Sequence, residues 1–174
     1  MLAGNTPTVY AYDSIQTTTL SSSSGTFAFT SIPQTYTHLQ IRMFTNTVRV
    51  GAPTGSGSLQ YNSDSTATNY YTHALYANGA TVSAFAANEN DGIWWLGDTT
   101  TNVVSIVDIL DYTNTNKYKT TRLLTGFDKN GSGSIGLVST LWKNTAAISR
   151  IDFVNNSGYN YNTYTTCALY GIRG

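Results

Sequence analysis

The sequence has few charged residues and almost no cysteine. Its 174 residues contain nine basic and nine acidic side chains, which leave no net charge, and a single cysteine, Cys167. One thiol can close no internal disulfide and cannot form a thiolate zinc site by itself. A monomer of this length hides roughly 70% of the surface of its unfolded chain, so we expect the fold to be stabilised by packing alone.

Two classes of partner are disfavoured by what the chain lacks. It has no cluster of lysine and arginine, whereas binding to nucleic acid needs a basic face that displaces counterions. No segment approaches the roughly 18 consecutive apolar residues of a membrane helix. Residues 1–5 contain neither the basic nor the apolar region of a secretion signal. We therefore expect a soluble chain that binds neither nucleic acid nor membranes.

The motifs of common enzyme chemistry are also missing. The sequence has no nucleophile elbow, no metalloprotease histidine pair and no phosphate-binding glycine loop. His38 and His73 fit surface or interface positions better than a general base. Asp108 with Asp111, or Glu89 with Asp91, could supply the two carboxyls of a glycoside hydrolase, but such residues are more often solvated. We expect no enzyme activity and no cofactor.

The residues that are present favour β-structure. Threonine, serine, asparagine and glycine dominate, and there are 13 tyrosines. Threonine and tyrosine favour strands, whereas asparagine, glycine and serine favour turns. Short apolar runs alternate with turn signals every eight to twelve residues or so. The sequence predicts one all-β domain over residues 1–174, a jelly-roll-like antiparallel β-sandwich of two sheets and about ten strands.

Individual strands carry more specific expectations. In the segment 38–45, Leu39, Ile41 and Met43 share one face and are expected in the core, with Phe44 on the other face. The segment 103–112 is the most apolar, which predicts a central strand covered on both faces. We expect the run 21–25 to be a hairpin loop, and Asn78-Gly79 predicts a two-residue hairpin.

One stretch resembles a calcium-binding loop. Asp128, Asn130 and Ser132 stand at its first, third and fifth positions, and a glycine stands at the sixth. The twelfth position is Ser139 instead of the glutamate that such loops use. An Asn-Gly turn between two strands explains the same residues without an ion. We favour the turn and expect no metal.

Exposed aromatic residues are the candidates for binding. Trp94 and Trp95 are adjacent on an expected strand, so their side chains leave opposite faces and one of them can meet a partner. The interface candidates are Trp94, Trp95, Trp142 and Phe44. A second group, Tyr159, Tyr161 and Tyr164, could form a platform on which sugar rings stack. The alternative is a tyrosine-rich loop packed on its own domain or on a neighbouring subunit.

Three segments resemble a known group of proteins. They are 27–41 (FAFTSIPQTYTHLQI), 141–151 (LWKNTAAISRI) and 168–172 (ALYGI). Their sequences and order are similar to those of small structural proteins of tailed bacteriophages, many from aquatic viral genomes. The resemblance implies a virion protein with a jelly-roll-like sandwich, without chemistry of its own and often trimeric.

The resemblance therefore predicts a non-enzymatic virion protein on the particle surface, made in the host cytoplasm. The β-strand pattern begins soon after the first residue. This fits a capsid decoration or cement protein on the head exterior better than a fibre. Its expected partners are copies of itself, as a homotrimer, and other virion proteins such as the major capsid protein. The alternatives are a tail fibre or receptor-binding component, and a carbohydrate-binding β-sandwich module that contacts a host glycan.

Overall fold

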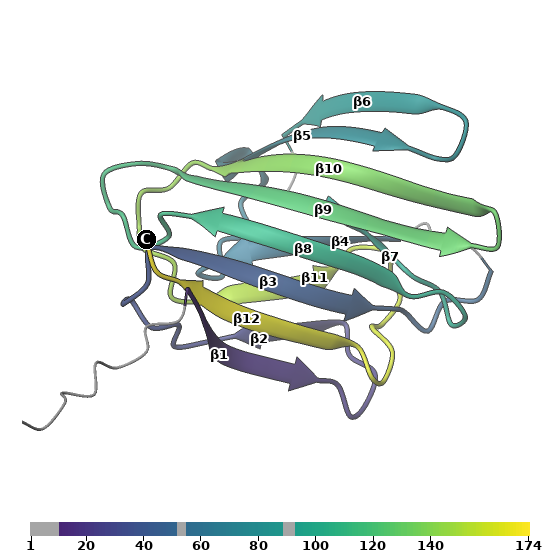
Figure 1. Cartoon of the computed structure of the whole chain (residues 1–174), viewed down its shortest axis with the longest axis horizontal. Helices are drawn as coiled ribbons and strands as arrows, with labels where there is room; N and C mark the ends of the chain where they lie inside the picture. The colour runs from purple at the N-terminus through teal and green to yellow at the C-terminus, as the bar shows by residue number, and fades with distance from the viewer. Residues whose placement is uncertain (1–10, 52–54, 89–92) are drawn as a thin grey trace, which may run out of the picture.

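Twelve β-strands and one 3₁₀ turn make up the regular structure of the described residues, which are 11–51, 55–88 and 93–174 of a computed structural model (Figure 1). For residues 93–95 only the backbone is described. The elements are β1 (Tyr12–Thr19), β2 (Thr26–Phe29), β3 (His38–Thr45), β4 (Gly55–Tyr61), η1 (Ala67–Asn69), β5 (Tyr70–Ala77), β6 (Val82–Ala87), β7 (Ile93–Leu96), β8 (Val103–Leu110), β9 (Lys119–Lys129), β10 (Ser132–Trp142), β11 (Ile151–Asn155) and β12 (Thr166–Ile172).

The strands form two antiparallel sheets whose order is that of a jelly roll. Strand β1 pairs with β12, β2 with β11, β3 with β8, and β4 with β7, so the chain resembles one long hairpin that is folded over on itself. Further pairing of β12 with β3 and of β11 with β4 closes two four-stranded sheets, β1-β12-β3-β8 and β2-β11-β4-β7. The predicted jelly-roll-like sandwich is confirmed, with twelve strands where about ten were expected.

Two additional hairpins widen the first sheet. Strands β9 and β10 follow β8, and β10 pairs with β5 of the hairpin β5–β6, which gives the order β1-β12-β3-β8-β9-β10-β5-β6. Figure 1 views this eight-stranded sheet from outside, with β4, β7 and β11 behind it and the β5–β6 hairpin at the top. One face of the wide sheet is thus turned away from the smaller sheet, and we term it the outer face.

The core lies between the sheets, and the alternation of β3 predicts it well. Leu39, Ile41 and Met43 are buried as expected. Phe27 and Phe29 pack against Phe153 with ring centroids 4.5 Å and 5.4 Å apart. A second aromatic group consists of Tyr61, Tyr70 and Trp142. The first group lies within the smaller sheet, on β2 and β11. The second joins the two sheets, because Tyr61 lies on β4 whereas Tyr70 and Trp142 lie on β5 and β10.

The most apolar segment, 103–112, is central in its sheet, as predicted, because β8 lies between β3 and β9. The expectation that both its faces are covered was wrong. Val103, Val107 and Ile109 are buried, but Val104 and Leu110 lie exposed on the outer face. Nothing in the described part of the chain covers these exposed side chains.

Two turns also differ from the prediction. Residues 21–25 join β1 to β2, which belong to different sheets, so they do not form a hairpin loop. The β5–β6 hairpin exists, but its loop has four residues, 78–81, instead of two, and it is closed by the Asn78 N–H donating to the Thr81 carbonyl over 3.2 Å. Gly79 supplies the positive φ, 91°, that this loop needs.

Candidate interaction surface

The outer face carries a row of aliphatic side chains across four neighbouring strands. Three successive register pairs build it: Ile106 of β8 with Leu124 of β9, Leu124 with Leu137 of β10, and Leu137 with Leu75 of β5. Because register partners on one face stand side by side, these four side chains form a continuous line. Their exposed fractions lie between 37% and 54%. Such large exposed values are unusual for four adjoining aliphatic residues.

A parallel row next to it contains Phe44, Val104, Gly126, Ile135, Ala77 and Val82. Phe44, Val104, Ile135 and Val82 are all exposed. We term the two rows together the apolar band. One row of four strands and one of six, at a spacing of about 4.8 Å and each about 7 Å deep, give the band an area of about 340 Å². Patches of this size on a protein surface mark interaction sites.

A polar row borders the apolar band. It contains Gln40, Asp108, Arg122, Ser139 and His73, which are register partners along β3, β8, β9, β10 and β5. The Gln40 side-chain amide donates to Asp108 Oδ1 over 2.9 Å and accepts from Arg42 Nε over 3.0 Å. Among the described residues Arg122 has no ion-pair partner. This face therefore combines an apolar centre with an ordered polar margin, as protein interfaces do.

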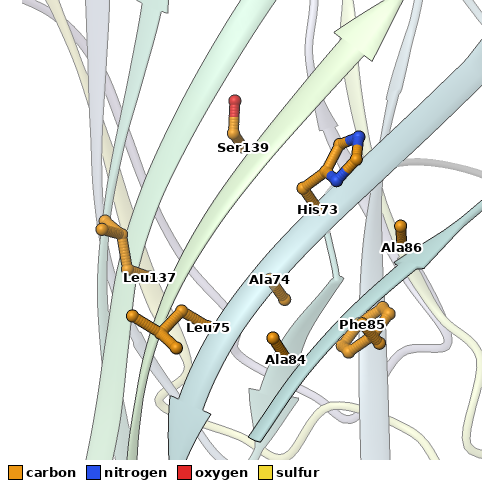
Figure 2. A pocket seen from close by; sticks show the side chains of 8 residues that line it. All are labelled: His73, Ala74, Leu75, Ala84, Phe85, Ala86, Leu137 and Ser139. Atoms are coloured by element: carbon orange, nitrogen blue, oxygen red, sulfur yellow. The ribbon is translucent and has the colours of Figure 1, made fainter.

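Two shallow hollows indent the outer face. One, of about 510 Å³, is lined by Val104, Ile106, Leu124 and Ile135, with Gly126 also in its lining. The other, of about 490 Å³, lies where β10, β5 and β6 adjoin. Figure 2 shows it with Leu75 and Leu137 along one side and His73 and Ser139 further along the same strands. Both hollows are lined mainly by apolar side chains, so they suit a protruding apolar group.

The four predicted interface aromatics have three different outcomes in the structure. Phe44 lies exposed in the apolar band. Trp94 and Trp95 lie on β7, and their side chains are outside the described residues. The prediction for Trp142 was wrong, because its side chain is 1% exposed and its indole N–H donates to Asp64 Oδ2 over 2.8 Å. Its inward position follows from β10, whose neighbouring residue Leu141 points to the outer face.

The three tyrosines do not form one platform. Tyr161 was wrongly predicted to contact glycan, because its ring is completely buried and packs edge-on against Phe27 at 5.2 Å. Tyr159 and Tyr164 are exposed, and the guanidinium of Arg49 lies over the Tyr159 ring at 5.5 Å. Tyr164 is 79% exposed and has φ of 71°, a strained value for an aromatic residue. Only Tyr159 and Tyr164 remain available to a ligand.

The calcium-like stretch is the turn of the β9–β10 hairpin, as favoured above. Lys129 ends β9, Ser132 begins β10, and the two residues between them, Asn130 and Gly131, have φ of 52° and 90°. Positive φ at both positions is the geometry of a type I′ turn, which joins the strands of a hairpin through a two-residue loop. Asp128 Oδ1 accepts the Gly131 N–H over 3.2 Å, so one carboxylate oxygen is used within the turn.

Asp108 and Asp111, one of the two candidate carboxylate pairs, do not converge on a cleft. Asp108 lies on the outer face, bound to Gln40, whereas Asp111 lies in the loop after β8 beside Lys117 and His38. The hydrogen bond from Lys117 is the main cause that lowers the pKa of Asp111. Glu89 and Asp91 lie outside the described residues. Within 11–51, 55–88 and 93–174, no three histidine, cysteine or acidic residues gather as a metal site.

Other ionisable groups are held inside the fold. Lys119 is fully buried, and its Nζ donates to the carbonyls of Asn114, Lys117 and Thr145 over 2.5, 3.1 and 3.0 Å. Burial lowers the pKa of Lys119, and the charge of Lys117 lowers it further. Burial raises the pKa of the Cys167 thiol, which makes it a poor nucleophile. These groups join loops or fill the core.

Sequence reasoning missed the aliphatic members of the apolar band. The signal was present as adjacent apolar pairs: Ile106-Val107, Leu123-Leu124 and Leu137-Val138. Successive residues of a strand point to opposite faces, so each pair places one side chain in the core and one outside. The pattern did indicate that both faces of these strands are apolar. It could not show that the second face has no cover within the described chain.

Comparisons with known proteins do not identify the chain. No protein-family model and no curated protein matches the sequence. One similar solved structure is a protein of unknown function from Shewanella oneidensis MR-1, which is 9% identical over 99% of this chain and 83% of its own, with a TM-score of 0.21. A similarity this low carries no argument about fold or function. In the described segments, no helix has the length and hydropathy to span a membrane.

Proposed function

We propose that this chain is a non-enzymatic structural protein of a bacteriophage virion, which binds its neighbours through the outer face. The observation that carries the proposal is the apolar band, two rows of mostly exposed apolar residues across β3, β8, β9, β10, β5 and β6 of the eight-stranded sheet. In the particle we assign it to the head exterior, as a decoration or cement protein. Its partners are copies of itself and the major capsid protein.

The energetics of the outer face support a binding role. Burial of about 340 Å² of apolar surface stabilises a contact by about 8 kcal/mol, at about 25 cal/mol per Å². Loss of free motion opposes association by an estimated 4–15 kcal/mol or so. One such face therefore suffices for a contact of low affinity. Many copies of that contact, repeated over a capsid lattice, hold the protein on the particle stably. Contacts of this kind suit a protein that covers a symmetric particle.

The link to bacteriophages is supported by the three segments that resemble small phage structural proteins. Segment 27–41 includes β2 and the first half of β3, segment 141–151 connects β10 to β11, and segment 168–172 belongs to β12. Ile32, Ile148 and Ile151 of these segments are buried. The resemblance thus covers residues that build the jelly roll, and it supports the virion assignment independently of the apolar band.

The test is the protein content of purified particles. Virions from the source of this sequence are separated on a density gradient, and the ratio of this chain to the major capsid protein is measured by quantitative mass spectrometry. A head decoration protein is expected in a fixed ratio set by the capsid lattice. A few copies per particle would assign the chain to the tail or its fibres. Absence from the particles would contradict the virion function.

A second candidate function is carbohydrate binding, which the exposure of Tyr159 and Tyr164 favours. Tyrosine rings present an apolar face to a sugar ring and a hydroxyl to its polar groups. A glycan array tests it with the chain and with the variants Tyr159→Ala and Tyr164→Ala. The matched control is Tyr118→Ala, which removes another exposed tyrosine. Binding that survives both tyrosine changes, or that Tyr118→Ala also removes, would exclude this site.

A further inference from the structure

We propose that a second copy of this chain docks face to face on the outer face, related to the first by a two-fold axis that runs parallel to the strands between β8 and β9. The inference rests on the proposed function, because it names the partner of the outer face. It is argued from the register of the two central strands, the charges on them and the area of the sheet.

The charges on β8 and β9 are arranged for such an axis. Asp108 and Arg122 are register partners that lie side by side on the outer face. The two-fold rotation exchanges β8 and β9 between the copies, so Asp108 of each copy meets Arg122 of the other. The dimer contact then contains two ion pairs, each between an Asp108 and an Arg122. An axis centred on β9 instead would place Arg122 against itself, and like charges in contact are strongly unfavourable.

The apolar residues match under the same rotation. Ile106 of one copy meets Leu124 of the other, and Val104 meets Gly126, each twice. Because Gly126 has no side chain, the hollow above it accepts the Val104 side chain of the second copy. Phe44 on β3 and Ile135 on β10 lie two strands from the axis on opposite sides and also meet. The contact therefore joins apolar groups to apolar groups at β8 and β9, whereas one strand further out Arg42 of β3 meets Leu137 of β10.

The area agrees with that of a stable dimer. The axis lies at the middle of the eight-stranded sheet, with β1, β12, β3 and β8 on one side and β9, β10, β5 and β6 on the other. Every strand of one copy therefore faces a strand of the second. Eight strands at about 4.8 Å and seven residues at about 3.4 Å give about 900 Å² per copy. Specific protein contacts bury about 800 Å² per partner.

The first measurement is the mass of the purified full-length chain by sedimentation equilibrium. The expected mass is twice the 18.8 kDa of one chain. A monomer at about 100 μM, a concentration at which a contact of micromolar Kd would be complete, would overturn the two-fold contact. A mass three times that of the chain would also overturn it, and would support the trimer that the phage resemblance implies.

Charge reversals test the position of the axis. Asp108→Arg places like charges in the contact, and so does Arg122→Asp, so each variant alone is expected to weaken self-association by about 100-fold. Mixed together, the two variants are expected to form a heterodimer, because every contact again joins opposite charges. The double variant D108R/R122D is expected to self-associate like the unmodified chain. Two-fold pairing between β8 and β9 is the geometry that produces this pattern.

Controls separate folding from association. Circular dichroism and thermal melting of each variant check that the sheet is intact. Arg150→Glu reverses a charge next to β11 of the smaller sheet, away from the outer face, and should leave the dimer unchanged. If both single variants fail to fold, Leu124→Lys provides the same test with an exposed aliphatic residue. Single variants that dimerise normally, or a mixture that stays monomeric, would overturn the proposal.

The outcome is distinguishable from failure of the proposed function. A chain that is monomeric in solution yet present in virions at a lattice ratio would overturn the two-fold contact and leave the virion function intact. A chain that dimerises as described but is absent from virions would overturn the virion function and leave the two-fold contact intact.

Discussion

Lys129 and Asp98 form an ion pair in which Lys129 Nζ lies 2.6 Å from Asp98 Oδ2, although the Asp98 side chain is 1% exposed. Asp98 Oδ1 also accepts the backbone N–H groups of Thr100 and Thr101, each over 2.8 Å. The same Nζ donates to the carbonyl of Gly51 over 2.8 Å. One buried carboxylate and one lysine thus join the turn before β8, the loop after β3 and the end of β9.

Replacement of this carboxylate should destabilise the fold. Asp98→Asn keeps the shape of the side chain but removes its charge, so the bond to Lys129 and those to the loop N–H groups weaken. We expect the free energy of unfolding to fall by about 2 kcal/mol, measured by urea denaturation. Asp128→Asn is the matched control, since this exposed aspartate lies next to Lys129 in the β9–β10 hairpin. An equal loss in both variants would contradict this role of Asp98.

Stability should also fall in acid. Burial raises the pKa of Asp98, but the hydrogen bonds from Lys129, Thr100 and Thr101 outweigh it and hold the pKa well below its ordinary value. For Asp64, burial is likewise outweighed by hydrogen bonds from Trp142 and Asn69.

A carboxyl whose pKa is lowered by folding stabilises the protein above the unfolded value of about 3.9, and this stability is lost as pH falls through the folded value. Urea midpoints between about pH 7 and about pH 2.5 should therefore decrease below about pH 4. The variant Asp98→Asn should show a shallower decrease. Identical pH curves for the variant and the unmodified chain would argue against the lowered pKa.

The contrast between Trp142 and Phe44 separates folding from binding. Trp142→Ala opens a cavity beside Tyr61 and Tyr70 and should lower the free energy of unfolding by about 3–5 kcal/mol. Phe44→Ala removes an exposed ring and should cost less than about 1 kcal/mol in a dilute sample, where the chain is monomeric. It should instead weaken self-association. If the two variants lose folding stability equally, the assignment of Phe44 to the binding surface is wrong.

The buried amine of Lys119 provides a further test. Its three hydrogen bonds join the loop after β8 to the loop after β10. Lys119→Met leaves three carbonyl groups without their donor, so we expect a loss of about 2–3 kcal/mol in urea denaturation. Lys143→Met, at an exposed lysine in the loop after β10, should change stability by less than about 0.5 kcal/mol. A neutral effect of Lys119→Met would show that water replaces the amine.

Local sequence pattern was sufficient for the class of fold and for much of the core. Strict alternation placed Leu39, Ile41 and Met43 correctly, because a strand with one covered face leaves a period of two in the sequence. Positive φ at Asn130 and Gly131 followed from residue types that tolerate it.

Contacts between distant segments could not be predicted. The buried indole N–H of Trp142 donates to Asp64, 78 residues earlier in the chain, and no local signal indicates that pairing. Tyr161 is buried because Phe27 and the loop after β1 lie against it. The exposure of Leu124 depends on which strands adjoin β9 and on what lies outside the sheet. Sequence alone therefore placed Phe44 correctly on an exposed face, but wrongly expected Trp142 and Tyr161 to be exposed as well.

Hydroxyl-radical footprinting tests the binding role of the outer face most directly. The assembled protein, in particles or as a concentrated solution, is compared with a dilute monomeric sample, and labelling is measured at Leu75, Leu124 and Leu137. Tyr118, which is exposed in a loop, serves as the internal reference. We predict that labelling of the three leucines falls in the assembly while labelling of Tyr118 is unchanged. Equal labelling of the leucines in both states would contradict the account.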